Sequence, residues 1–395
     1  MRQVDVVVIG GGLAGSVAAA MLGRRGIDTV LIDPHESYPP DFRCEKLDRS
    51  QVALLRKTGL HYDVRRAVTA PDGLWVARGA GHAEKRSSGQ YTFMYDTLVN
   101  AVRAAIPPGV RFVPGKVSSV LTSPGRQSIT LSTGETFAAR LAVVAMGLNV
   151  SLLHSLGITR RVESACHSIS IGFDVMPLDR PRFDFPALTY HPERFSERIS
   201  YLSLFPVAHT TRANLFVYRQ MQDLWLRDMR YGAPETMLAA MPGLARHLGR
   251  FDVTSAVKIR PVDLYVSEGH RQHGMVLVGD AFATSCPAAG TGANKALCDV
   301  ERLCNVHIPR WLATNGMELG KIAQFYDDPV KQASDAASAE KARYVKAIAT
   351  ERGLRWSARR WTKTLGHRLG LGAIRDLPHR LTAGMRRQSA PGTPA

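Results

Sequence analysis

The chain has 395 residues, of which 45% are hydrophobic and 7% aromatic, and a formal net charge of +17. This length and composition are those of a globular protein with room for two or three structural units, and they exclude a chain that is disordered throughout. No apolar stretch reaches the roughly 20 residues of a membrane-spanning helix. The five cysteines lack the spacing of a metal site, so we expect reduced thiols and no metal.

The first predicted elements form a strand, a glycine-rich turn and a helix. An apolar run at residues 6–9 precedes a Gly-x-Gly-x-x-Gly pattern, and an alanine-rich helical stretch covers 16–25. A second apolar run at 29–32 ends at Asp33, about 20 residues past the glycines. This order is typical of a βαβ unit that binds a dinucleotide.

Each glycine of this unit has a physical role. Gly12 lets the backbone approach a pyrophosphate, and Gly15 lets the helix pack closely on the strand. The helix N-terminus offers free N–H groups to phosphate, and Asp33 can accept a hydrogen bond from a ribose hydroxyl. The candidate cofactor residues are Gly10, Gly12, Leu13, Ala14, Gly15, Asp33 and Pro34.

A second glycine motif lies about 265 residues further along the chain. Residues 276–278 are apolar, Gly279-Asp280 follows, and Pro287-x-x-Gly-Thr-Gly-Ala-Asn294 comes next. This motif resembles that of the class A flavin monooxygenases, the para-hydroxybenzoate hydroxylase type. The resemblance implies FAD as cofactor, with Asp280 on the ribitol and a helix N-terminus directed at the flavin. The implied contacts are Asp280, Pro287, Gly290, Thr291, Gly292 and Ala293.

The same resemblance assigns roles between the two motifs. Arg43 lies in the loop before a helical pattern at 51–58, where the family places an arginine on the pyrophosphate or the flavin. A surface pair of Arg43 with Asp41 or Glu45 is the alternative. Predicted strands at 110–120 follow a predicted helix at 91–105 and put backbone near Val117 at the adenine.

An apolar strand at 141–149 ends in a small-x-Gly turn, which makes Ala145 and Gly147 cofactor candidates. Many relatives carry Asp-Gly there, followed by a serine and an arginine. In the family, that Asp-Gly pair is tied to the handling of flavin and of pyridine nucleotide. The chain has Met146-Gly147 and no arginine until Arg160. We therefore expect slow direct reduction by NAD(P)H, and a separate flavin reductase is a possible partner. The tryptophan motif of flavin-dependent halogenases is absent.

The middle segment is predicted to hold the substrate. Period-2 patterns at 167–173, 199–206 and 213–219 favour an antiparallel sheet with one face towards a cavity, and a helical pattern covers 233–248. The substrate candidates are His167, Tyr201, Asn214 and Tyr218. In the family, a flavin C4a-hydroperoxide carries the hard step, so catalytic side chains cannot be identified from the sequence.

The last 55 residues contain 13 Lys and Arg against two acidic residues, with apolar side chains interleaved. Three interpretations remain open: a helical cap on the enzyme, contact of residues 341–387 with an anionic membrane surface, and an acidic or carrier-like partner. No nucleic-acid motif accompanies the charge.

Together the patterns predict an α/β fold, with a Rossmann-like FAD-binding domain, an inserted antiparallel-sheet substrate domain and a C-terminal helical region. The predicted units are 1–162 with 259–330, then 163–258, then a basic helical region at 331–387 and a disordered tail at 388–395. We expect a cytoplasmic FAD-dependent oxidoreductase, foremost a monooxygenase on a small organic substrate. The first alternative is a flavin-dependent reductase or dehydrogenase on a lipid-like substrate, as in the related geranylgeranyl reductases, or a halogenase-like enzyme supplied with reduced flavin. The second is a non-catalytic flavin-binding accessory protein.

Overall fold

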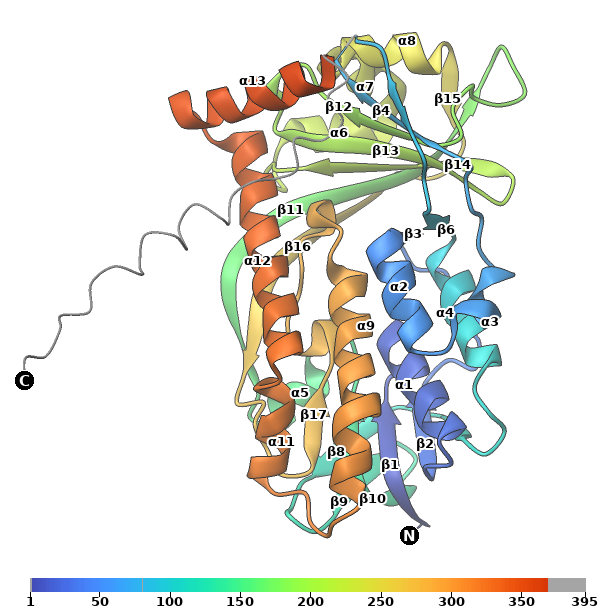
Figure 1. Cartoon of the computed structure of the whole chain (residues 1–395), viewed down its shortest axis with the longest axis vertical. Helices are drawn as coiled ribbons and strands as arrows, with labels where there is room; N and C mark the ends of the chain where they lie inside the picture. Colours follow the sequence, from blue (N-terminus) through green and yellow to red (C-terminus); the bar gives the residue numbers. More distant parts are fainter. Residues whose placement is uncertain (1, 80, 369–395) are drawn as a thin grey trace, which may run out of the picture.

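A computed structural model describes residues 2–79 and 81–368. Two large sheets lie one above the other along the long axis of the molecule, and helices cover the lower sheet (Figure 1). No described helix is both long enough and apolar enough to cross a membrane.

The lower sheet contains the predicted βαβ unit. Its strand order is β7-β2-β1-β10-β9-β8, with β17 also paired to β10. Its strands are β1 (Arg2–Ile9), β2 (Thr29–Asp33), β7 (Arg111–Pro114), β8 (Val117–Leu121), β9 (Gln127–Leu131), β10 (Thr136–Val144) and β17 (Met275–Leu277). The β7-β2-β1-β10-β17 part is parallel, and its central strands are apolar on both faces because both faces are covered. The predicted α/β fold with a Rossmann-like domain is confirmed.

The upper sheet has the order β15-β11-β14-β13-β12-β4-β5, with β16 also paired to β11. Its strands are β4 (Leu74–Arg78), β5 (Glu84–Arg86), β11 (Thr159–Pro177), β12 (Leu188–His191), β13 (Ile199–Val207), β14 (Thr210–Val217), β15 (Phe251–Val253) and β16 (Lys258–Glu268). Most neighbours are antiparallel, as the alternation predicts, and only β12 and β4 run parallel. The predicted domain bounds stay predictions. In the structure, β4 and β5 join this sheet from outside 163–258, and β11 crosses residue 162.

The helices fall into three groups by position. Those around the lower sheet are α1 (Leu13–Arg24), α2 (Arg49–Lys57), α3 (His61–Arg65), α4 (Tyr95–Ala104), α5 (Ser151–Ser155), α9 (Gly292–Arg302), α10 (Ile308–Leu312) and α11 (Leu319–Tyr326). Those on the upper sheet are α6 (Leu224–Tyr231), α7 (Ala233–Ala240) and α8 (Ala245–Leu248). The C-terminal pair is α12 (Pro329–Thr350), which lies along α9, and α13 (Leu354–Arg368), which turns away at its end (Figure 1).

Two predicted helices differ from the structure. The pattern at 233–248 is interrupted after Ala240 because Pro242 cannot continue a helix. The helix predicted at 91–105 begins only at Tyr95, since Tyr91 and Thr92 form a short strand, β6, paired with β3 (Lys46–Leu47).

In the basic region, α12 and α13 are separated at Gly353, whose φ of 114° no L side chain adopts easily. The remainder of that region and the predicted tail, residues 369–395, lie outside the described residues.

Candidate functional site

The first glycine turn is shaped by close packing at two of its three glycines. Gly10 joins β1 to α1 at a φ of 101°, and a Cβ there would lie 2.7 Å from the carbonyl oxygen of Ala145. A Cβ on Gly15 would lie 1.8 Å from the carbonyl oxygen of Gly10. Both positions therefore require glycine for the protein's own fold.

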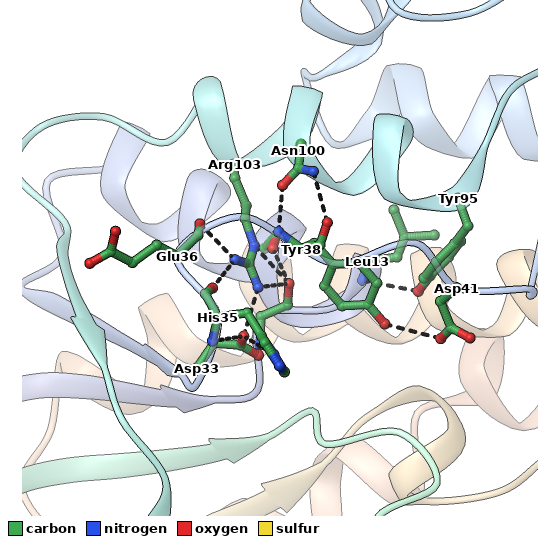
Figure 2. A network of polar contacts seen from close by, with 11 residues as sticks. Leu13, Asp33, His35, Glu36, Tyr38, Asp41, Tyr95, Asn100 and Arg103 are labelled. Carbon is green, nitrogen blue, oxygen red and sulfur yellow. Dashed lines mark hydrogen bonds and ion pairs between the residues drawn. The ribbon is translucent and has the colours of Figure 1, made fainter.

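Gly12 is different, because the fold itself does not need glycine there. Its φ is −71°, and a Cβ would meet only Tyr95 and Tyr38, at 3.8 and 3.9 Å. These are ordinary contact distances, and the position faces a cavity. The missing side chain thus leaves room for a ligand at the N-terminus of α1, a position that favours phosphate. The N–H of Leu13, the first residue of α1, donates to the Tyr95 hydroxyl at 3.3 Å (Figure 2).

Asp33, at the end of β2, is held from several sides (Figure 2). One carboxylate oxygen accepts a hydrogen bond from the N–H of Gly11 at 2.7 Å, and the other lies 3.0 Å from Arg103. The guanidinium of Arg103, which comes from α4, also donates to the carbonyl oxygens of Gly11, His35 and Glu36. These contacts fix the turn and orient Asp33 at the edge of the cavity, where a ribose is expected.

The second glycine motif adjoins the first across the lower sheet. After β17, Gly279-Asp280 forms a tight turn, and the segment from Pro287 leads through Gly290, with a φ of 65°, into α9. The N–H of Gly279 donates to Asp299 of α9 at 2.9 Å, which ties the turn to the helix. Burial raises the pKa of the Asp280 carboxyl, against the opposing charges of Arg43, Lys295 and Arg160.

Arg43 lies between the two motifs. Its guanidinium pairs with Asp41 at 2.5 Å and lies 3.5 Å from Asp280. Asp41 in turn binds Arg260 of β16 at 2.8 Å, and these two arginines hold the pKa of Asp41 below its usual value although burial would raise it. The ion pair of Arg43 with Asp41, which was the alternative to a cofactor contact, is therefore present. Arg43 nevertheless also lines the cavity beside Asp280.

One cavity of about 450 Å³ brings both motifs together with the upper sheet. Sixteen of the residues predicted from sequence line it, namely Gly10, Gly12, Leu13, Ala14, Asp33, Pro34, Arg43, Ala145, Gly147, Tyr201, Asn214, Asp280, Pro287, Gly290, Gly292 and Ala293. Five others do not. Gly15 lies inside the packing of α1, Val117 is in the core, and Thr291 binds Ser338 of α12.

The remaining two, His167 and Tyr218, lie outside the cavity wall. Their ring centres lie 6.0 Å apart, edge to face. Nδ1 of His167 is 3.1 Å from the Ser164 hydroxyl, and the Tyr218 hydroxyl lies 3.9 Å from the buried sulfur of Cys286. Burial lowers the pKa of His167 to about 4, so its ring is neutral at pH 7.

Strand register explains which middle residues reach the cavity. Across β11, β14 and β13, Ser170 pairs with Phe216 and Phe216 with Tyr201, while Asn214 lies opposite Ser203. Alternate residues of these strands share a face, so this polar and aromatic face meets the cavity, and the intervening apolar residues pack beneath α6–α8. The sequence contains this alternation, but not the register that aligns one strand with the next.

Several lining residues were not predicted as site residues. They are Tyr38, Glu45, Lys46, Tyr95, Ser170, Ser203, Phe205, Phe216, Arg260 and Val262. Burial raises the pKa of Glu45 to about 7 and lowers that of Lys46. The period-2 pattern could have identified Ser170, Ser203 and Phe216, whereas nothing local marks Glu45.

Near Gly147, an arginine arrives from a distant strand. Arg160 of β11 donates to the carbonyl oxygen of Gly147 at 3.4 Å, and its guanidinium lies 4.0 Å from the ring centre of Tyr265. The sequence spacing did not indicate this contact. Met146 still offers no carboxylate at the turn.

The residues present fit FAD. The open position at Gly12 and the N-terminus of α1 suit the pyrophosphate, and Asp33 suits a ribose. Asp280 and Arg43 suit the ribitol side, and the N-terminus of α9 faces the same cavity. Within the described residues, no group of three or more His, Cys, Asp or Glu side chains could hold a metal ion.

A family model described as "FAD binding domain" matches residues 3–103 and 116–306 of the chain. Among curated proteins, the ubiquinone hydroxylase UbiL of Rhodospirillum rubrum is 24% identical over 76% of this chain and 71% of its own length. The 3-demethoxyubiquinol 3-hydroxylase of Escherichia coli is 24% identical over 77% of this chain and 80% of its own.

Solved structures share the fold. A p-nitrophenol 4-monooxygenase, PnpA from Pseudomonas putida, matches with a TM-score of 0.73 at 16% identity, over 91% of this chain and 92% of that one. An aklavinone-11 hydroxylase in a ternary complex with FAD and aklavinone matches with a TM-score of 0.67 at 20% identity, over 89% of this chain and 70% of that one.

Proposed function

The chain belongs to the FAD binding domain family and is an FAD-dependent oxidoreductase, and we propose that it hydroxylates a small organic substrate as a monooxygenase. The observation that carries this proposal is the single cavity shared by the two glycine motifs and the polar face of the upper sheet. A substrate on that face would lie directly against the cofactor.

The chain's own residues would bind, orient and exclude water, while bound FAD supplies the activation of oxygen. The N-terminus of α9 and Arg43 offer positive charge at the flavin end of the cavity. Phe205, Phe216 and Val262 line the substrate side and limit the access of water. Tyr201 donates its hydroxyl proton to the carbonyl oxygen of Ala288 at 3.0 Å, which fixes its ring between the sheet and the turn before α9.

The electron source is part of the proposal. Met146 stands where many relatives have an aspartate, and this supports slow direct reduction by NAD(P)H and supply by a separate flavin reductase. Anaerobic stopped-flow reduction of the FAD-loaded protein by NADPH and by NADH tests it. Rapid reduction by either nucleotide, stimulated by a bound phenol, would contradict it.

A peripheral membrane contact is a further, separate proposal. Leu354 at the start of α13 is 90% exposed, and the neighbouring Arg352 and Arg355 are exposed as well. An apolar side chain between two exposed cations supports a contact with an anionic lipid surface.

The decisive experiment traces the oxygen atoms of O₂ into the product. FAD-loaded protein is reduced anaerobically, mixed with ¹⁸O₂ and a panel of phenols, and the products are examined by mass spectrometry. We expect one labelled oxygen atom in the product of at least one substrate. Protein that retains no FAD would overturn the proposal. So would reduced protein that converts all of its oxygen to hydrogen peroxide with every phenol, or that spends its electrons on saturating an added alkene instead of on oxygen.

A further inference from the structure

One wall of the cavity is a loop, residues 38–45, that has almost no backbone support. Six of its eight residues line the cavity, while Pro39 and Pro40 are exposed on the outside and have no N–H group to donate. Among the residues that the structure describes, none forms a backbone–backbone hydrogen bond with residues 39–44. A segment without such bonds can move while every sheet and helix stays intact.

Both ends of this loop are fixed. The N–H of Tyr38 donates to the side-chain oxygen of Asn100 at 2.8 Å, and the amide group of Asn100 donates back to the carbonyl oxygen of Tyr38 at 3.1 Å (Figure 2). At the other end, the carbonyl oxygen of Glu45 accepts a hydrogen bond from the N–H of Phe93, and β3 follows, paired with β6. Only the segment between these two ends is free to swing.

The other irregular walls of the cavity are held by backbone hydrogen bonds. After β10, the N–H of Ala145 donates to the carbonyl oxygen of Ile9 at 2.8 Å. In the second glycine segment, the N–H of Thr284 donates to the carbonyl oxygen of Tyr265 at 3.2 Å. Opening the cavity at either place would break such bonds, so the 38–45 loop is the wall that opens at the lowest cost.

Two side chains hold the middle of the loop against the upper sheet. One carboxylate oxygen of Asp41 accepts a hydrogen bond from Arg260 of β16 at 2.8 Å. The ring of Phe42, which is 6% exposed, fills the space beside Gly172 of β11, where a Cβ would lie 2.3 Å from the ring. The side chains of Asp41 and Arg260 are 20% and 37% exposed, so water screens their ion pair and leaves it weak.

We propose that the 38–45 loop is the gate through which FAD enters and leaves, and that the Asp41–Arg260 pair and Phe42 beside Gly172 keep this gate closed. Asp41 and Arg260 act here as positioning residues. The inference goes beyond the proposed hydroxylation, because it concerns how the cofactor reaches its site and holds for any substrate.

A gate and an ordinary cofactor contact differ in their kinetics. If contacts that close the gate are removed, the loop is open more often, and FAD enters and leaves faster by the same factor. The equilibrium affinity then changes little. If a contact to FAD itself is removed, the affinity falls, and the change appears mainly in the dissociation rate.

The test measures both rate constants on the full-length protein. Stopped-flow absorbance follows the entry of FAD into protein freed of its flavin, and protein loaded with radiolabelled FAD and chased with unlabelled FAD gives the exit rate. We expect Arg260→Gln to raise both constants by about three- to fivefold. Asp41→Asn should do the same, whereas Asp41→Glu, which keeps the carboxylate, should stay closer to the wild type.

A second variant reaches the gate from the sheet. Gly172→Ala removes no charge but pushes on the ring of Phe42, so it should also raise both constants. The matched control is Asp63→Asn, which removes a pair with Arg24 of the same length, 2.8 Å, and of similar exposure, 36% and 34%. Neither residue lines the cavity, so both constants should stay at the wild-type values.

An Arg260→Gln protein that raises the exit rate alone, or neither rate, overturns the gate. So does an Asp63→Asn protein in which both rates rise as much. Circular dichroism shows whether Gly172→Ala has folded, and if it has not, Arg260→Gln decides the matter. A protein that binds no FAD overturns the gate and the proposed function together. Absent oxygen transfer with the expected exchange rates overturns the proposed function alone.

Discussion

The ammonium group of Lys331 lies 3.0 Å from a carboxylate oxygen of Asp299, and both side chains are 1% exposed. The other carboxylate oxygen of Asp299 accepts the N–H of Gly279, the residue before Asp280. Lys331 also binds Asp335 at 2.8 Å and lies 4.1 Å from the ring centre of Phe282. A residue of α12, beyond the segment that the family model matches, thus supports the Gly279-Asp280 turn, where a cofactor contact is expected.

Replacing Lys331 with Met should therefore reduce both stability and FAD retention. The change leaves the Asp299 carboxylate buried without its cation, a loss that typically costs about 3–5 kcal/mol. Urea denaturation and the flavin absorbance after gel filtration measure the two effects. Lys341→Met, at an exposed position of the same helix, should change neither, and an equal loss in that variant would refute the specific role of Lys331.

Two glycines of the first turn should respond to substitution in different ways. Gly12→Val should leave the fold intact but put a branched side chain where the pyrophosphate is expected, so the protein should purify colourless. Gly15→Ala should instead unfold or aggregate, because its Cβ would lie 1.8 Å from the Gly10 carbonyl oxygen. Circular dichroism and flavin absorbance separate the outcomes. A yellow Gly12→Val protein would contradict the assignment of this turn to FAD.

Asp328, which caps the N-terminus of α12, should give a pH-dependent contribution to stability. Burial raises its pKa, but hydrogen bonds from Arg302, His307 and the backbone of Lys331 outweigh burial and lower the pKa to about 2. Because the folded-state pKa is below the unfolded value of about 3.9, the contribution is complete above about pH 4 and disappears as the pH falls towards 2.

The corresponding variant is Asp328→Asn, which can keep the cap but loses the ion pairs. We expect it to be less stable than the wild type at pH 7 by about 2 kcal/mol, with the difference narrowing by pH 3. Urea denaturation at pH 7, 4 and 3 provides the measurement. A difference that is constant over this range would show that the carboxylate charge is not its origin.

Charge reversal at the start of α13 tests the membrane contact. The double change Arg352→Glu and Arg355→Glu should weaken co-sedimentation with vesicles that contain phosphatidylglycerol, by roughly 1 kcal/mol per charge lost. Binding should also decline with added salt, since the Debye length is about 10 Å at 0.1 M. Arg56→Glu with Lys57→Glu, exposed on α2, is the matched control. If the wild-type protein ignores these vesicles at low salt, the proposed contact is wrong.

The sequence predicted the parts of the site that depend on local spacing. The turn at Gly10–Gly15 and the segment from Asp280 to Ala293 each carry their function in a few consecutive residues, so their patterns can be identified without the fold. The predicted FAD cofactor is supported by the family match. His167 and Tyr218 were chosen for their chemistry, but both lie past the end of the β11–β14 ladder, whose last pair is Ile169 with Val217, and neither lines the cavity.

The residues that sequence reasoning missed depend on distant contacts. Arg103 reaches Gly11 across 92 positions, and Lys331 reaches Asp299 across two helices. Beside burial, the charges that act on the pKa of Glu45 are those of Arg212, Asp174 and Lys258, on three strands that lie far along the chain. Such properties arise only when the chain has folded, and no local pattern reports them.

A single short loop carries Arg43 at the cofactor end of the cavity and Glu45 at its substrate end, with Phe42 seated on Gly172 between the two sheets. Any movement of this loop as FAD binds would shift both residues at once. A ligand screen on cofactor-free protein would therefore test a pocket whose loop can differ from that of the FAD-bound enzyme. Compound libraries should be tested on the flavin-loaded form.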